Sequence, residues 1–167
     1  MSEFVYLILG CKSSGRRYVL FDLLKDMTSE TDPFTLLLPE GEEPNEWNDK
    51  LAGIGHLTLE YYKGDVNAIA PDQINPHHTN IILSPELGNP VDQVEALKPL
   101  VEQSGCELGR IISVVHCDQL EAHQQLGAWY DACIHFSDVC LINRGAATTN
   151  KFIQNFIDHH KEKHIPC

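Results

Sequence analysis

The chain has 167 residues, of which 43% are hydrophobic and 22% are charged, and this balance predicts a folded domain rather than a disordered polypeptide. Acidic residues outnumber basic ones by 24 to 12, so the net charge of −12 argues against a surface that neutralises a nucleic-acid backbone. No apolar run approaches the roughly 20 residues of a membrane span, and no signal-peptide pattern opens the chain. We therefore expect a cytoplasmic protein that has neither nucleic acid nor membrane among its partners.

Short apolar runs alternate with longer amphipathic stretches. The run at 4–9 is continuous and ends at Gly10, which is typical of a strand covered on both faces, and a helix is predicted after it, up to about Met27. Further strands are predicted at 34–38, 56–62, 79–83, 109–115 and 138–142, with a short or edge strand at 65–70. Helices are predicted as one turn around Trp47, at 90–105, at 118–135 in two pieces broken at Gly127, and after a cap at Thr148 or Thr149.

This alternation indicates right-handed crossovers between parallel strands. The predicted fold class is α/β, a three-layer α/β/α sandwich with a mostly parallel central sheet. Folds of this class bind ligands at the carboxyl ends of their strands. We expect one domain over residues 1–167. Because the sequence reaches Cys167 just where a further strand would begin, a longer protein could continue the sheet.

Six cysteines are dispersed along the chain, with no Cys-x-x-Cys pair among them. Most of them sit in apolar runs, where a free cysteine behaves as a small hydrophobic side chain. Because the chain shows no secretory context, a disulfide framework is not expected. We interpret them as reduced core thiols: Cys11, Cys106, Cys117, Cys133, Cys140 and Cys167.

The loop after the first strand has the spacing of a phosphate-binding loop. Gly10-Cys11-Lys12-Ser13-Ser14-Gly15 follows a buried strand and opens a helix in the order G-x-x-x-x-G. Backbone amides of such a loop surround an anion at the helix N-terminus. Arg16 and Arg17 stand where that motif has lysine and a hydroxyl residue, and Arg17 offers no hydroxyl to Mg²⁺. Two hypotheses stay open: the loop holds a phosphate, or it is a simple turn with solvated basic residues.

Two further segments accompany this loop. Residues 80–90 read Asn-Ile-Ile-Leu-Ser-Pro-Glu-Leu-Gly-Asn-Pro, and residues 135–144 read His-Phe-Ser-Asp-Val-Cys-Leu-Ile-Asn-Arg. In this order the three segments resemble those of the CobW-like P-loop GTPases, a family of metal chaperones and metal insertases. The first looks like the family's phosphate loop, the second like its switch segment, and the third like the strand before its base-recognition motif. The resemblance implies a P-loop NTPase-like domain over most of the chain.

The same resemblance shows where the family's chemistry is missing. Arg16 corresponds to the phosphate-loop lysine, Arg17 to the Mg²⁺-binding hydroxyl residue, and Leu83 to the acidic residue that ends the third core strand. The switch glycine corresponds to Glu86, and the guanine-binding aspartate to Ala146. The family's Cys-x-Cys-Cys metal motif is absent, since residues 39–78 contain no cysteine. The nucleotide- or phosphate-binding residues that the resemblance implies are Gly10, Cys11, Lys12, Ser13, Ser14, Gly15, Arg16, Arg17, Asn143 and Arg144.

Phosphoryl transfer needs a metal, a charge clamp and an oriented water, and the metal has lost two expected ligands here. We therefore expect a degenerate CobW-like domain that binds a nucleotide or another anion without efficient GTP hydrolysis and that regulates metal homeostasis. GTP or another nucleotide is the expected ligand, without Mg²⁺. One alternative is an active Mg²⁺-dependent NTPase in which Glu86 or Asp118 holds the metal. The other is a scaffolding domain that binds a protein partner and no nucleotide.

Three groups of titratable residues lie outside the loop. His159, His160, His164 and Cys167 lie close together at the C-terminus, where His160 and His164 share a helix face at metal-ligand spacing. We interpret this group as a solvated tail, interpret His77 and His78 as a loop pair, and assign no metal ligands. His116-Cys117-Asp118 is interpreted as a strand end in which Asp118 caps the next helix, with an activated thiolate as the alternative. Trp129, Tyr130 and Phe136 are assigned to the core.

Overall fold

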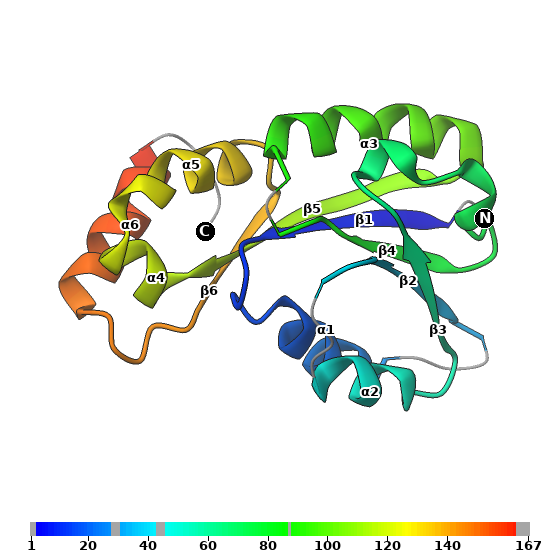
Figure 1. The fold of residues 1–167 in the computed structure, drawn as a ribbon, viewed down its shortest axis with the longest axis horizontal. Coiled ribbons are helices and arrows are strands. Elements are labelled where there is room, and N and C mark those ends of the chain that lie inside the picture. The colour runs from blue at the N-terminus through cyan, green and yellow to red at the C-terminus, as the bar shows by residue number, and fades with distance from the viewer. Residues whose placement is uncertain (1–2, 28–30, 43–45, 87, 163–167) are drawn as a thin grey trace.

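A computed structural model describes residues 3–27, 31–42, 46–86 and 88–162. Its centre is a six-stranded sheet in which every strand runs parallel to its neighbours, in the order β3-β2-β4-β1-β5-β6 (Figure 1). The strands are β1 (Phe4–Gly10), β2 (Phe34–Pro39), β3 (Leu57–Tyr62), β4 (Thr79–Leu83), β5 (Glu107–His116) and β6 (Val139–Asn143). The expected α/β class and the central position of the first strand are confirmed.

Helices cover both faces of this sheet. Helices α1 (Arg16–Leu24) and α2 (Glu46–Ala52) lie on one face, and α3 (Pro90–Ser104) and α5 (Gly127–His135) lie on the other (Figure 1). Helices α4 (Cys117–Ala122) and α6 (Asn150–Glu162) pack with α5 at the β6 edge of the sheet, around a third apolar cluster. The arrangement is a three-layer α/β/α sandwich.

The sequence of β1 explains its central place. Val5, Leu7 and Leu9 are buried beneath α3, whereas Ile8 is buried on the face that α1 covers. An apolar residue at nearly every position allows both faces of a strand to be buried, as a central parallel strand requires. Because β1 ends at Gly10 between β4 and β5, the loop that follows opens at the carboxyl edge of the sheet.

The sequence predicted some elements incorrectly. The segment at 65–70 is not a strand but contains a 3₁₀ turn, η1 (Val66–Ala68), and a second such turn, η2 (Pro71–Gln73), follows it. The backbone N–H of Val66 donates to Oε1 of Gln93 on α3, so it is not available to a sheet ladder. Helix α2 is longer than the single turn expected around Trp47.

The predicted division of 118–135 is right, but the break is not at Gly127. Helix α4 ends at Ala122, because the φ of −130° at the next residue, His123, is not helical, and a 3₁₀ turn, η3 (Gln124–Leu126), leads into α5. Gly127 is instead the first residue of α5. None of the helices in the described part of the chain is long and apolar enough to cross a membrane.

Candidate anion-binding site

The loop between β1 and α1 adopts a curled conformation. Ser13 has a φ of 62°, and Gly15, which precedes the first residue of α1, has φ 87° and ψ 20°. The N–H of Ser14 donates to the carbonyl of Cys11 at 3.2 Å and closes a turn. A left-handed residue followed by a right-handed one turns successive backbone N–H groups toward one concave side, which is a geometry that binds anions. The helix dipole of α1 adds positive potential there.

This loop borders a cavity of about 270 Å³, which we call the cup. Four basic side chains line it, and two acidic ones, Glu46 and Glu86, face them. A chain of net charge −12 therefore gathers a third of its 12 basic residues around one cavity. A concentration of basic side chains makes the local potential more positive, and part of this charge is balanced by Glu42, which contacts both Arg16 and Arg17. The cup is lined by Cys11, Lys12, Ser13, Ser14, Gly15, Arg16, Arg17, Tyr18, Glu46, Trp47, Glu86 and Arg144.

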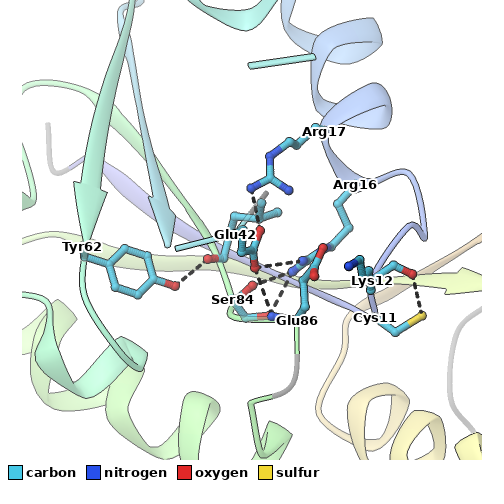
Figure 2. A network of polar contacts seen from close by, with 9 residues as sticks. Cys11, Lys12, Arg16, Arg17, Glu42, Tyr62, Ser84 and Glu86 are labelled. Carbon is cyan, nitrogen blue, oxygen red and sulfur yellow. Dashed lines mark hydrogen bonds and ion pairs between the residues drawn. The ribbon is translucent and has the colours of Figure 1, made fainter. Parts of the chain in front are cut away.

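Arg16 is fixed beneath the loop by contacts with the protein itself. Its Nη1 donates to the backbone carbonyl of Ser84 at 2.6 Å, just beyond β4, and its Nη2 lies 3.7 Å from a carboxylate oxygen of Glu42 (Figure 2). Burial lowers the pKa of Arg16, and Glu42 opposes that shift. A Cβ at Gly10 would lie 2.7 Å from Cδ of Arg16, so glycine is required beneath this side chain.

Arg17 and Glu42 form a second buried contact at 2.6 Å, between Nη2 and Oε2. The other oxygen of Glu42 accepts a hydrogen bond from the backbone N–H of Glu86 at 3.1 Å (Figure 2). Glu42 thus joins α1 to the segment after β4. Burial, and then the nearby Glu42 charge, raises the pKa of the Glu86 carboxyl, which faces the cup.

Asn143, the last residue of β6, braces the loop from outside the cup. Its Nδ2 donates to the carbonyl of Ser14 at 2.8 Å. A Cβ at Gly15 would lie 2.3 Å from the same Nδ2, so only glycine allows the two segments to approach this closely. The side chain that the resemblance assigns to base recognition is therefore committed to the backbone of the loop.

Arg144 follows with a φ of 54° and lines the cup. Positive φ is unfavourable for a residue with a Cβ, and such strain collects at functional sites. In the described part of the chain three residues other than glycine have positive φ, and Ser13 and Arg144 are two of them. Both line the cup, so the backbone there adopts unfavourable positive φ angles at two positions.

Of the two carboxylates considered as metal ligands, Glu86 lines the cup and Asp118 does not. Asp118 Oδ1 accepts from the hydroxyl of Thr148 and from the N–H of Ala147, so it stabilises the segment before α6. Asp118 is not the cap of α4 either, because Nδ1 of His116 accepts from the N–H of Gln119 at that helix start. Of the two residues predicted as the cap of the last helix, Thr149 takes that role, since its Oγ1 accepts from the N–H of Phe152, whereas the hydroxyl of Thr148 donates to Asp118.

Burial raises the pKa of two thiols that follow neighbouring strands, Cys11 after β1 and Cys117 after β5. Cys11 Sγ lies 2.8 Å from the hydroxyl of Tyr130, and burial raises its pKa. Cys117 is fully buried and burial raises its pKa to about 11, so an activated thiolate at this place is not supported. The five cysteines in the described ranges are buried and free, as expected, and Cys167 lies outside those ranges.

The structure brings together most of the residues that the sequence singled out. The loop from Cys11 to Arg17 and Arg144 line the cup, whereas Gly10 and Asn143 lie behind it and support it. Tyr130 is core as predicted, while Trp129 is partly buried and donates from Nε1 to the carbonyl of Gly88 at 3.2 Å. Phe136 is also only partly buried.

Sequence reasoning missed Glu42, Ser84 and Tyr62, which anchor the cup from below. The hydroxyl of Tyr62 donates to the carbonyl of Leu83 at 2.6 Å, beside the Arg16 contact with Ser84 (Figure 2). No motif marks these positions, since each makes its contact with an element distant in sequence. The only available signal was the pair of arginines, because two buried guanidiniums require a carboxylate partner.

The histidine groups were interpreted partly wrongly. His160 is only 1% exposed, because it continues the apolar side of α6 that begins with Phe152 and Phe156, so it is not part of a solvated tail. His159 is exposed, and His164 and Cys167 lie outside the described residues. In the 77–78 pair, His78 Nδ1 lies 2.8 Å from the hydroxyl of Thr35, whereas His77 is exposed.

Comparison of the sequence with models of known protein families and with curated proteins finds no significant match.

Proposed function

We propose that this chain is a degenerate CobW-like domain that binds the phosphate groups of a nucleotide, or a comparable small anion, in the cup without hydrolysing it efficiently. The observation that carries the proposal is the preformed curl of the loop at the N-terminus of α1, with left-handed Ser13 and Gly15. Lys12 and Arg144 also line the cup, beside the two arginines that contact Glu42. By its resemblance to metal chaperones, the domain has a regulatory role in metal homeostasis.

Two features support binding without a metal. The position of the Mg²⁺-binding hydroxyl is held by Arg17, whose guanidinium is paired with Glu42. The strand end that would supply an acidic ligand carries Leu83, which is fully buried in the apolar cluster under α1 and α2.

The position of Arg16 supports the absence of efficient hydrolysis. A phosphate-loop lysine reaches the β- and γ-phosphates, where it stabilises charge that develops during transfer. Arg16 instead directs Nη1 at Ser84, beneath the loop. Turning the Arg16 guanidinium toward a bound phosphate would break its hydrogen bond to the Ser84 carbonyl and its contact with Glu42. Loss of one charge-stabilising group typically costs about a hundredfold to a thousandfold in rate.

The size of the cup supports a phosphate chain as the bound part. Pockets for whole drug-sized ligands measure about 300–1,000 Å³, and the cup has about 270 Å³. A di- or triphosphate group fits this space, while a nucleoside would extend beyond it. Because Asn143 is bound to Ser14 and Ala146 replaces the guanine-binding aspartate, we expect little preference between GTP and ATP.

Thermal unfolding with GTP, ATP and their diphosphates, each with Mg²⁺ and with EDTA, tests this function. A ligand present at 100 times its Kd adds about 2.7 kcal/mol of stability. The proposal expects a similar upward shift in Tm for GTP and ATP that does not require Mg²⁺. Asn143→Ala should reduce every shift alike, because it loosens the loop rather than a base contact.

The alternatives give different results in the same experiment. A shift that needs Mg²⁺ and is accompanied by phosphate release would indicate an active NTPase. No shift with any nucleotide or with inorganic pyrophosphate would refute binding at the cup and leave the scaffolding hypothesis.

A further inference from the structure

Helices α5 and α6 bring three metal-ligand side chains together at the edge of the molecule, away from the residues that line the cup. Asp131 belongs to the middle of α5, and His159 and His160 are consecutive residues near the end of α6. The two helices lie side by side in the fold (Figure 1). One ligand atom from each of the three residues lies within 4.8 Å of the others.

The three side chains differ in burial in a way that forms a half-closed site. His160 is 1% exposed and packs edge-on against Phe156, with ring centroids 4.5 Å apart. Asp131 and His159 have side chains that are about half exposed, at 46% and 52%. The site therefore has one ligand fixed in the core and two at the surface, where an ion can enter from solvent.

The distances are close to those of a metal site. Nε2 of His160 lies 3.5 Å from Oδ1 of Asp131, and Nε2 of His159 lies 3.9 Å from the same oxygen. Ligand atoms about 2.0–2.1 Å from a tetrahedral zinc ion are separated by roughly 3.3 Å. The distances from Asp131 are close to that spacing, and the two imidazoles lie within 4.8 Å of each other, so rotation of the exposed Asp131 and His159 side chains would close the cluster around an ion.

The two imidazole rings lie next to each other, with centroids 5.0 Å apart, and both approach the same carboxylate oxygen. A divalent cation lets both rings remain neutral, because each supplies a nitrogen lone pair and Asp131 supplies an anionic oxygen. Two nitrogen ligands and one carboxylate favour zinc and its transition-metal neighbours over Mg²⁺ or Ca²⁺.

We propose that Asp131, His159 and His160 form a binding site for a divalent transition-metal ion of the zinc class, with the remaining coordination position open to solvent. Three protein ligands with one open position is the arrangement of exchangeable or reactive zinc sites rather than of closed structural ones. The site is independent of phosphate binding at the cup.

Calorimetric titration of the full chain with Zn²⁺ alone tests this site, with Mg²⁺ as the comparison ion. We expect one equivalent of Zn²⁺ to bind and Mg²⁺ not to bind. Asp131→Asn and His159→Ala should each weaken Zn²⁺ binding at least tenfold. Both residues are half exposed, so both variants should keep the metal-free Tm of the parent chain. His77→Ala and Asp72→Asn remove an exposed histidine and an exposed carboxylate elsewhere, and they should leave binding unchanged.

Thermal unfolding with Zn²⁺ gives a second measurement of binding, so that the test does not depend on a single variant. Zn²⁺ in excess should raise the Tm of the parent chain and of the two control variants, should raise that of Asp131→Asn and of His159→Ala by less, and should not raise that of their double variant. The proposal is overturned if Zn²⁺ does not bind stoichiometrically, or if binding persists unchanged in the double variant. The second result would place the ion on other residues.

Discussion

At the scale of single residues, Arg16 decides what the cup can do. Its guanidinium is nearly completely buried and is held by Ser84 and Glu42, so it acts as a structural cation that ties the start of α1 to the end of β4. Arg17, the next residue of α1, also forms an ion pair with Glu42. Both arginines are thereby withdrawn from the chemistry that lysine and a hydroxyl residue would perform at the same positions.

Replacing Arg16 should destabilise the protein more than replacing Arg17. Arg16→Ala removes a buried charged donor and leaves the Ser84 carbonyl unsatisfied, so we expect a loss of about 3 kcal/mol, whereas Arg17→Ala should cost about half as much. Arg16→Lys should fall between them, because an ammonium lacks the planar fork. Urea unfolding measures these differences. Equal losses for both alanine variants would contradict the structural role of Arg16.

If the cup binds an anion as proposed, Glu86 should oppose that binding, because its carboxyl lines the cup. Its raised pKa means that the folded chain favours the protonated carboxyl, so ionisation costs stability as the pH rises through the folded-state pKa. Glu86→Gln should therefore raise Tm at pH 7, and the gain should disappear below about pH 4, where the carboxyl is protonated in both states.

The same Glu86→Gln variant should bind pyrophosphate roughly fivefold more tightly at pH 7, since about 1 kcal/mol of repulsion at a few ångströms is removed. Glu95→Gln, an exposed change on α3, serves as the control for charge alone. An equal gain in the control would show that net charge, and not the cup, is responsible.

At the scale of elements, the cup depends on the contact between the end of β6 and the loop before α1. The N-terminus of α1 supplies the amides, and β6 supplies Asn143, which holds the loop through Ser14. Gly15 is required at this junction for two reasons, its φ of 87° and the 2.3 Å approach that a Cβ would make to Asn143. A side chain there would displace either the loop or the strand end.

Gly15→Val should abolish pyrophosphate binding while leaving the far-ultraviolet circular dichroism unchanged, because the sheet does not depend on the loop. Gly105→Ala is the matched control: its φ is 73°, but nothing lies within 4 Å of the added Cβ. The control should lose roughly 1 kcal/mol for its positive φ and retain full binding. Retention of binding by Gly15→Val would contradict the assigned loop geometry.

At the scale of the whole molecule, apolar periodicity predicted the six strands at the centre of the fold and most of the helices. The periodicity wrongly predicted a strand at 65–70. This segment forms turns that pack beneath α3, and the backbone N–H of Val66 donates to the side chain of Gln93 instead of to a neighbouring strand. The periodicity also failed for His160, which is buried through the packing of α6 on α5. The loop was found because glycine spacing is local. Glu42, Ser84 and Asp131 were missed because their roles arise only when distant elements meet.

The chain as a whole is acidic, whereas the cup gathers basic side chains, and this difference can be tested. An acidic chain repels anions in general, so anion binding at one place must come from local donors and basic side chains. Raising the ionic strength weakens both the general repulsion and the local attraction, and the exposed charges are screened first. Binding by the backbone amides at the start of α1 should therefore survive moderate salt.

Titration calorimetry with inorganic pyrophosphate in EDTA, at 150 mM salt, tests the central claim most directly. Pyrophosphate presents the phosphate chain without a base, and EDTA removes any divalent metal. We predict saturable binding of one pyrophosphate per chain that Gly15→Val abolishes and Gly105→Ala retains. Absence of saturable binding in the parent chain, or binding that appears only when Mg²⁺ is restored, would contradict the account.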